Sequence, residues 1–366
     1  MKRFLSLFLT AVFLIAAAVP AFAEKALDPA KKATEIIQYY RQETKTPESS
    51  EETLIFAATH LLTDSIPPYF TPIEDGTPAA DVAKRICQSI AAKQDPTNDN
   101  GQNYTALLAE KQQENGSFEN TLHDTVYAVI ALQAADAEYN RDQAIAYILS
   151  RQKEDGGFSY TEDSANEIEA TATTLTVLST VRNENKTYYD AAADALAFLK
   201  NRQNEDGGFS SSGVSNCVET AWAILAAADM ERISDENWTK ALKTLSEFQA
   251  PDGGYGLVKD LGQSDRQSTA LALMAFESAR YGASVYKTLA TNKTIAPSFS
   301  FENFKPILYV FCVLAVLSVI FWIFIFVRKP KTRTLEESKH QTEAAIEAAE
   351  RYIRKEQEKN KNETQN

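Results

Sequence analysis

The chain has 366 residues, of which 44% are hydrophobic, and its formal charge at pH 7 is −13. Most of this charge lies in 24–327, where 25 Lys and Arg face 42 Asp and Glu, a net of −17 (25 − 42). This acidic balance excludes nucleic-acid binding, which needs basic side chains against phosphate, and argues against flat docking on anionic lipid. Three cysteines in the whole chain exclude a disulfide-rich scaffold.

The first 23 residues are predicted to form a signal peptide. Lys2 and Arg3 make a basic start, an apolar run follows over 4–19, and Ala21-Phe22-Ala23 has the small-x-small form of a cleavage site. The mature chain would then begin at Glu24, with an uncleaved N-terminal anchor as the alternative.

The central region repeats itself. Four segments share the pattern Gln-x-x-Asp/Asn-Gly-Gly/Ser-aromatic, and their aromatic residues are Phe118, Phe158, Phe209 and Tyr255. In each unit a helix runs into the Gln, and the Asp-Gly pair ends it because Gly accepts the left-handed conformation of a helix C-terminus. A second helix follows a polar loop and carries a threonine with aliphatic residues four and seven positions on, at Thr125, Thr171, Thr220 and Thr269. This stripe predicts helices that pack on one another.

Two earlier segments, 52–57 and 80–85, resemble the second helix of a unit. Pro67, Pro68 and Pro72 lie between them and disfavour a regular helix there, so one outer helix is expected to be short or missing. The count predicts six inner helices, at about 52–63, 79–92, 121–135, 166–182, 216–229 and 265–280.

The Gln-x-x-Asp-Gly-Gly-Phe units resemble the prenyltransferase/squalene-cyclase repeat over most of 31–281. The resemblance implies an all-α fold, an (α/α)6 toroid of six helical hairpins, to which the sequence adds one transmembrane helix. The segments 95–98, 104–108 and 123–127 resemble bacterial surface proteins related to the cobalamin-binding domain of transcobalamin and intrinsic factor. Because this toroid serves cyclases, lipid transferases, thioester proteins and carriers, the fold does not decide the function.

The catalytic motifs of the enzymatic relatives are not found. Where a protonating cyclase has Asp-x-Asp-Asp, this chain has His123 in place of the acid, and histidine is too weak an acid to protonate an alkene. No Asp-Asp-x-x-Asp cluster occurs, and the zinc-ligand positions of protein prenyltransferases hold Asn216, Val218 and Ser268. No cofactor and no catalysis are therefore expected. A weaker hypothesis is a metal site made of His123, Asp124, Cys217 and Glu219, against buried cysteines and helix-capping acids as the commoner interpretation.

One set of positions predicts a binding site. The residue before each threonine should lie at the mouth of the ring, and four of six are acidic: Glu52, Asp81, Asp124 and Glu219. One turn further on, the wall should carry Lys84, Tyr127 and Trp222. An acidic rim over an aromatic wall favours a small amphipathic or cationic ligand. The alternative is that each acid only complements the dipole of its own helix.

The C-terminal part predicts membrane attachment. The toroid (24–281) would be followed by a stalk linker (282–306), a 21-residue apolar transmembrane helix (307–327) and a charged cytoplasmic tail (328–366), with basic residues on the cytoplasmic side. The sequence thus predicts a single-pass cell-membrane protein whose extracytoplasmic toroid binds a small ligand, a membrane transport protein or a surface protein without catalysis. An extracytoplasmic terpene cyclase or prenyltransferase is the alternative.

Overall fold

The computed structural model describes residues 27–42, 45–99, 101–160, 167–260, 262–291, 314–316, 318 and 335–363. The chain divides into two units, 1–298 and 299–366, each of which is described by itself. Among the described residues all regular secondary structure is helical, so the all-α prediction is confirmed.

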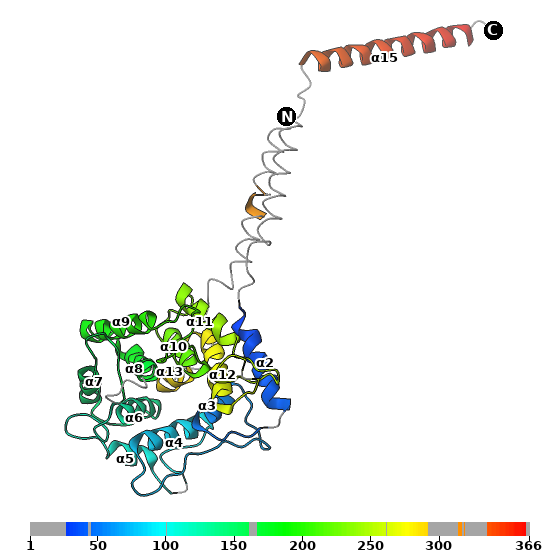
Figure 1. The fold of residues 1–366 in the computed structure, drawn as a ribbon. Helices are drawn as coiled ribbons and strands as arrows, with labels where there is room; N and C mark the ends of the chain where they lie inside the picture. The colour runs from blue at the N-terminus through cyan, green and yellow to red at the C-terminus, as the bar shows by residue number, and fades with distance from the viewer. Residues whose placement is uncertain are drawn as a thin grey trace. The chain divides into compact units, whose positions relative to one another are not determined.

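An inner ring of helices organises the first unit (Figure 1). Each inner helix packs against the next, and the last packs against the first, which closes the ring. In the described residues these helices are α3 (Ser50–Ala58), α4 (Ala79–Ala91), α6 (Leu122–Ala134), α8 (Glu167–Val181), α10 (Cys217–Asp229) and α12 (Arg266–Tyr281). Apart from α3, which ends five residues early, their bounds agree with the predicted ones to within one residue.

A second set of helices covers the outside of the ring. They are α2 (Pro29–Gln42), α5 (Tyr104–Ala109), α7 (Arg141–Ser150), α9 (Lys186–Asn201) and α11 (Glu236–Ser246). The segment 59–78, which contains Pro67, Pro68 and Pro72, forms no helix. One hairpin of the toroid therefore lacks its outer helix, because proline removes a backbone donor and clashes with the preceding turn.

The repeat motif fixes the turn between an outer and an inner helix. In the third repeat, Gln203 Nε2 donates to the carbonyl oxygens of Gly207 at 2.8 Å and Asn237 at 2.7 Å, which ties the turn to the next outer helix. Gly207 has a φ of 92°, a backbone conformation that side chains disfavour. The aromatic residue that follows, Phe209, is fully buried and stacks on Trp238 of α11. The motif thus anchors each hairpin to its neighbour.

A further helix lies inside the ring. Helix α13 (Val285–Ala290) contacts α6, α8, α3 and α4, and Figure 1 shows it among the inner helices. Its residues Val285 and Tyr286 are buried. The sequence places these residues in a stalk that begins at 282, whereas the structure packs them into the toroid. The reason is that the apolar face of α13 is covered only inside the ring.

The second unit contains the long helix α15 (Leu335–Glu363), whose Ile346, Tyr352 and Ile353 are exposed. In the part of the chain that the structure describes, no helix combines the length and the apolar character needed to cross a membrane. The prediction of a single-pass membrane protein therefore finds no support among these residues. The predicted signal peptide lies outside the described residues, as does the predicted span 307–327 apart from 314–316 and 318.

Candidate functional site

Aromatic side chains from separate elements meet inside the ring. Tyr286 of α13 stacks on Trp222 of α10, with ring centroids 6.0 Å apart, and meets the edge of Tyr127 of α6 at 6.1 Å. His123, one turn before Tyr127, lies 5.0 Å from that ring and 4.8 Å from Tyr160. The three rings of Tyr127, Trp222 and Tyr286 are almost completely buried. The interior of the toroid is therefore lined by a continuous aromatic cluster.

The register of the inner helices explains this arrangement. The repeat threonine faces the turn, since Thr125 Oγ1 accepts a hydrogen bond from the N–H of Phe118 at 2.9 Å. Residues four apart share a helix face, so the positions two before and two after the threonine face the ring axis together. On α6 these are His123 and Tyr127. On α8 they are Glu169 and Thr173, and the Thr173 hydroxyl shares a hydrogen bond with Tyr160.

Acidic side chains gather where the inner helices begin. Glu169 lies in the first turn of α8 and is partly buried. Burial raises the pKa of its carboxyl, Glu51 and Glu219 raise it further, and Lys84 opposes them. Glu51, Glu169 and Glu219 lie in the first turns of α3, α8 and α10, so acidic groups gather where three inner helices begin, which we call the mouth of the ring. Glu169 therefore holds a proton more readily than an exposed glutamate does.

Two basic groups complete this mouth. The ammonium group of Lys84 lies 5.3 Å from the centre of the Tyr127 ring and 3.7 Å from a carboxylate oxygen of Asp81. Burial and Lys84 lower the pKa of His123, and Asp124 and Asp81 only partly offset them. His123 is therefore mainly neutral at pH 7 and can accept a proton, whereas Glu169 keeps its proton to a higher pH than an exposed glutamate does.

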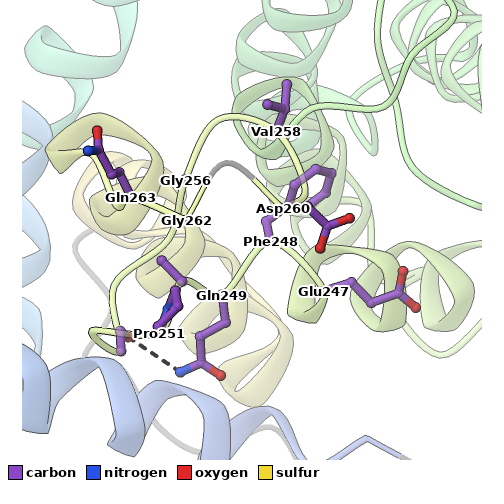
Figure 2. A pocket seen from close by; sticks show the side chains of 11 residues that line it. Glu247, Phe248, Gln249, Pro251, Gly256, Val258, Asp260, Gly262 and Gln263 are labelled. Atoms are coloured by element: carbon purple, nitrogen blue, oxygen red, sulfur yellow. Dashed lines mark hydrogen bonds between the residues drawn. The ribbon is translucent and has the colours of Figure 1, made fainter.

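A different hollow lies at the last repeat turn, between α11 and α12. Its volume is about 620 Å³. Figure 2 shows that glycines and the side chains of Glu247, Gln249, Asp260 and Gln263 are among the residues that line it. Gln249 is engaged in the turn itself, since its Nε2 donates to Gly253 O at 3.3 Å. Because Gln249 is already bonded within the turn and no aromatic cluster lines the hollow, it offers less chemistry than the ring interior.

Comparison with known proteins gives the family. The prenyltransferase alpha-alpha toroid domain matches residues 86–210 and 171–362, which together span most of the chain. The chain belongs to this toroid family. The resemblance found in the repeats is thus confirmed.

Two curated members of related sequence carry the same name, drimenyl diphosphate synthase. The protein from Streptomyces showdoensis is 34% identical over 119 residues, which cover 31% of this chain and 22% of the relative. The protein from Streptantibioticus cattleyicolor is 30% identical over 189 residues, which cover 46% of this chain and 34% of the relative. The matches thus span about a fifth to a third of the relatives' length.

Two solved structures are also similar to this chain. One is a protein from Actinoplanes, with a TM-score of 0.48, 14% identity and coverage of 69% of this chain and 99% of the other. Another is protein geranylgeranyltransferase-I from Candida albicans, complexed with GGPP, with a TM-score of 0.43, 16% identity and coverage of 70% and 85%.

These relatives correct the functional prediction. The sequence favoured a toroid that binds a ligand without catalysis, because the acid, diphosphate and zinc motifs are missing. The two relatives of related sequence are instead named as synthases, which favours the enzymatic alternative. The prediction tested fixed motif positions and did not consider Glu169, an acid in the first turn of the next inner helix.

The predicted rim acids of the toroid occupy different places. Glu52 is 1% exposed, accepts the N–H of Glu48 at 2.7 Å and pairs with Arg266 at 2.7 Å. Asp124 accepts the N–H of Ala80 at 2.7 Å and the hydroxyl of Thr121.

Glu219 accepts the N–H and the hydroxyl of Ser211. Asp81 remains partly exposed beside Lys84. The position before the threonine thus points toward the neighbouring helix or loop rather than toward the axis, because each residue turns a helix by about 100°.

The predicted wall residues lie in the ring interior. Lys84, Tyr127 and Trp222 belong to the aromatic and basic groups described above, and ligand binding by them stays a prediction. The sequence did not point to Glu169, Tyr160 or Tyr286. Glu169 could have been found, because it lies two residues before the repeat threonine Thr171, just as Tyr127 lies two residues after Thr125. Tyr286 had none, because nothing in the repeat pattern places 285–290 inside the ring.

The candidate metal ligands do not converge. In the described ranges no three His, Cys, Asp or Glu side chains are placed to hold a metal ion. Cys217 is buried and directs its Sγ toward the carbonyl oxygen of Ser268 at 3.5 Å, between α10 and α12. Burial raises the pKa of its thiol, which disfavours the thiolate that zinc needs. A zinc of the protein prenyltransferase kind therefore does not fit these residues.

Proposed function

We propose that this chain is an enzyme of the terpene synthase or prenyltransferase type, which takes an isoprenoid substrate into the ring of the toroid. The observation that carries the proposal is Glu169, a partly buried acid with a raised pKa on the inward-facing side of α8. Burial raises the pKa of the Tyr127, Tyr160 and Tyr286 hydroxyls, and the charge of Glu169 raises it further. Membership in the toroid family and the names of the two related synthases support the same class of substrate.

The aromatic cluster suits the substrate and the charge that develops on it. An isoprenoid chain is apolar, so the buried rings favour its transfer from water. A carbocation formed on the chain is attracted to the faces of Trp and Tyr rings, and this attraction is stronger where water is excluded. Trp222 and Tyr127, which both contact the Tyr286 ring, would supply such faces.

Glu169 and His123 would carry the protons. The electron pair of an alkene takes the proton of Glu169 and forms a C–H bond, which leaves a carbocation on the neighbouring carbon. Loss of a proton from an adjacent carbon to neutral His123 or to water restores a double bond. The reaction is then a proton-neutral rearrangement that needs no oxidant or reductant. The raised pKa of Glu169 matters because a general acid must be protonated near the working pH.

The proposal is tested by product analysis. The purified full chain is incubated with geranyl, farnesyl and geranylgeranyl diphosphate, and the extracts are examined by gas chromatography with mass spectrometry. Glu169→Gln should lower the rate by at least about 100-fold, since it keeps the size of the side chain but removes the proton.

Glu277→Gln is the matched control. Burial raises the pKa of Glu277 as well, yet this residue lies toward the C-terminal end of α12 and pairs with Arg280. Its substitution should leave the rate unchanged. Folded protein that forms no product from the three diphosphates would overturn the proposal.

A further inference from the structure

Helix α13 occupies the interior of the ring in which the substrate would bind. It packs on α6, α8, α3 and α4, and its Tyr286 contacts the rings of Trp222 and Tyr127, which are only 4% and 3% exposed. The hollow beside Val285, near the ends of α3 and α12, has a volume of only about 10 Å³. A pocket for an organic ligand measures roughly 300 Å³ or more, so an isoprenoid chain would have to displace α13.

The polar attachment of α13 is concentrated at the end of α10. Asp229 Oδ1 accepts the N–H of Ser284 at 2.6 Å, and Oδ2 accepts its hydroxyl at 2.8 Å. The backbone carbonyl of Asp229 accepts from Lys287 Nζ. Asp229 is fully buried and also accepts the hydroxyl of Thr176 of α8 at 2.7 Å. A buried carboxylate is tolerated only with such donors around it, so the same bonds that satisfy Asp229 hold α13 in the ring.

The link between α12 and α13 is short and contains a glycine. Gly282 ends α12 with a φ of 76°, a left-handed conformation that glycine adopts readily, and only Ala283 separates it from Ser284. Rotation at Gly282 would therefore move α13 as a unit. Helices shorter than about 12 residues are marginal in water, so the six-residue α13 keeps its fold only while the ring holds it.

One group of α13 is poorly satisfied inside the ring. The hydroxyl of Tyr286 is buried without a hydrogen-bond partner in the part of the chain that the structure describes. A buried polar group without a partner costs free energy, and this cost is relieved when the group returns to water. It weakens the hold of the ring on α13.

We propose that α13 is a plug, which occupies the isoprenoid site in the resting protein and swings out at Gly282 when an isoprenoid chain enters. The inference rests on the proposed function, because the ligand that competes with α13 is the substrate class of that site. The plug and the isoprenoid chain cover the same apolar wall, so only one of them binds there at a time. Affinity for an isoprenoid then depends on the fraction of molecules in which α13 is out.

The first experiment loosens the plug. Dissociation constants of farnesyl diphosphate are measured by calorimetry on the full-length wild type, Ser284→Ala and Lys287→Met. Each variant removes an attachment to Asp229 and leaves Tyr127 and Trp222 in place. Each should bind about fivefold more tightly than the wild type, because it raises the fraction of open molecules.

Asn185→Ala is the matched control for a lost helix cap. Asn185 Oδ1 accepts the N–H of Tyr188 at 3.0 Å at the start of the outer helix α9, as Ser284 Oγ accepts the N–H of Lys287 at the start of α13. Its loss destabilises a helix away from the ring interior, so farnesyl diphosphate should bind to this variant as it binds to the wild type.

The second experiment follows α13 directly. Hydrogen exchange over 284–290 is read by mass spectrometry on the full-length wild type, with and without saturating farnesyl diphosphate. Exchange of these amides should rise at least about tenfold on binding, because a displaced α13 loses its helix.

The outcomes separate this inference from the proposed function. Binding with unchanged or slower exchange over 284–290 overturns the plug alone, as do loosened variants that bind no more tightly than the wild type. Binding by the loosened variants but not by the wild type supports the plug, since the wild type then stays closed. Absence of binding in the wild type and in both loosened variants overturns the proposed function and the plug together.

Discussion

The backbone N–H of Phe209 donates to Thr220 Oγ1 at 2.9 Å, and the same bond recurs in every complete repeat. Phe209 and Thr220 are fully buried, so water cannot replace the acceptor. The bond joins the aromatic residue of each turn to the inner helix that follows. The aromatic residue of the repeat motif and the threonine of the next inner helix are thus the donor and the acceptor of the same hydrogen bond in each complete repeat.

Loss of this acceptor should destabilise the toroid. Thr220→Val keeps the shape of the side chain but leaves the Phe209 N–H buried and unpaired, which should cost about 1–3 kcal/mol in the free energy of unfolding. Thr239→Val on the exposed face of α11 is the control and should change it by less than about 0.5 kcal/mol. Urea unfolding measures both. Equal stability of the two variants would show that the bond does not stabilise the repeat.

Substitution of two glycines, Gly208 in the third repeat motif and Gly213 in the loop after it, should separate backbone strain from crowding. A Cβ at Gly208 would meet Ser215 Oγ at 2.5 Å and Thr244 Cγ2 at 2.9 Å, whereas Gly213 has a φ of 82° and open space around it. Gly213→Ala should cost about 1 kcal/mol from strain alone. Gly208→Ala should cost more, because the backbone or its neighbours must move. Thermal unfolding of both variants tests the order, which would reverse if strain outweighed crowding.

The raised pKa of Glu169 predicts a pH dependence. Between its ordinary value of 4.5 and its raised value in the fold, the folded state binds more protons than the unfolded state. Wild-type stability should therefore fall relative to Glu169→Gln as pH rises through this window. Urea unfolding of both proteins from pH 4.5 to 8 measures the difference, and exposed Glu154→Gln is the control. A difference that stays constant with pH would contradict the environment described for Glu169.

Asp229 should hold α13 in place. Ser284→Ala removes one hydrogen bond to Asp229 and the cap of α13, and should increase amide exchange over 284–290 with a loss of about 1 kcal/mol in stability. Asp229→Ala should cost more, since it leaves several buried donors unpaired. Hydrogen exchange read by mass spectrometry localises the effect. Unchanged exchange of 284–290 in both variants would mean that other contacts hold α13.

A variant of Glu52 tests whether this acid binds a ligand at the rim or only stabilises the fold. Glu52→Gln weakens the ion pair with Arg266 and the bond to the Glu48 N–H, so stability should fall by about 1–3 kcal/mol. Affinity for isoprenoid diphosphates should stay within twofold of the wild type. Weaker binding with unchanged stability would instead indicate that Glu52 contacts the ligand at the mouth of the ring.

The sequence by itself determined the ring and its repeating turns. The spacing of Thr125, Thr171, Thr220 and Thr269 located four inner helices to within one residue, because a buried helical stripe repeats with the helix period. The three prolines between the first two inner helices correctly predicted that an outer helix is missing there. Local chemistry decides these features, and local chemistry is readable in a sequence.

Only the tertiary structure decided which side of each helix faces the axis. The sequence placed the site at the residue before the threonine, Glu52 and Asp124, whereas the residue two before it, Glu169 or His123, faces inward. A shift of one residue rotates a side chain by about 100°, and that rotation depends on how neighbouring helices pack. The place of Tyr286 depends on the hydrogen bonds between Ser284 and Asp229, which lie far apart in the chain. No local sequence pattern could therefore reveal it.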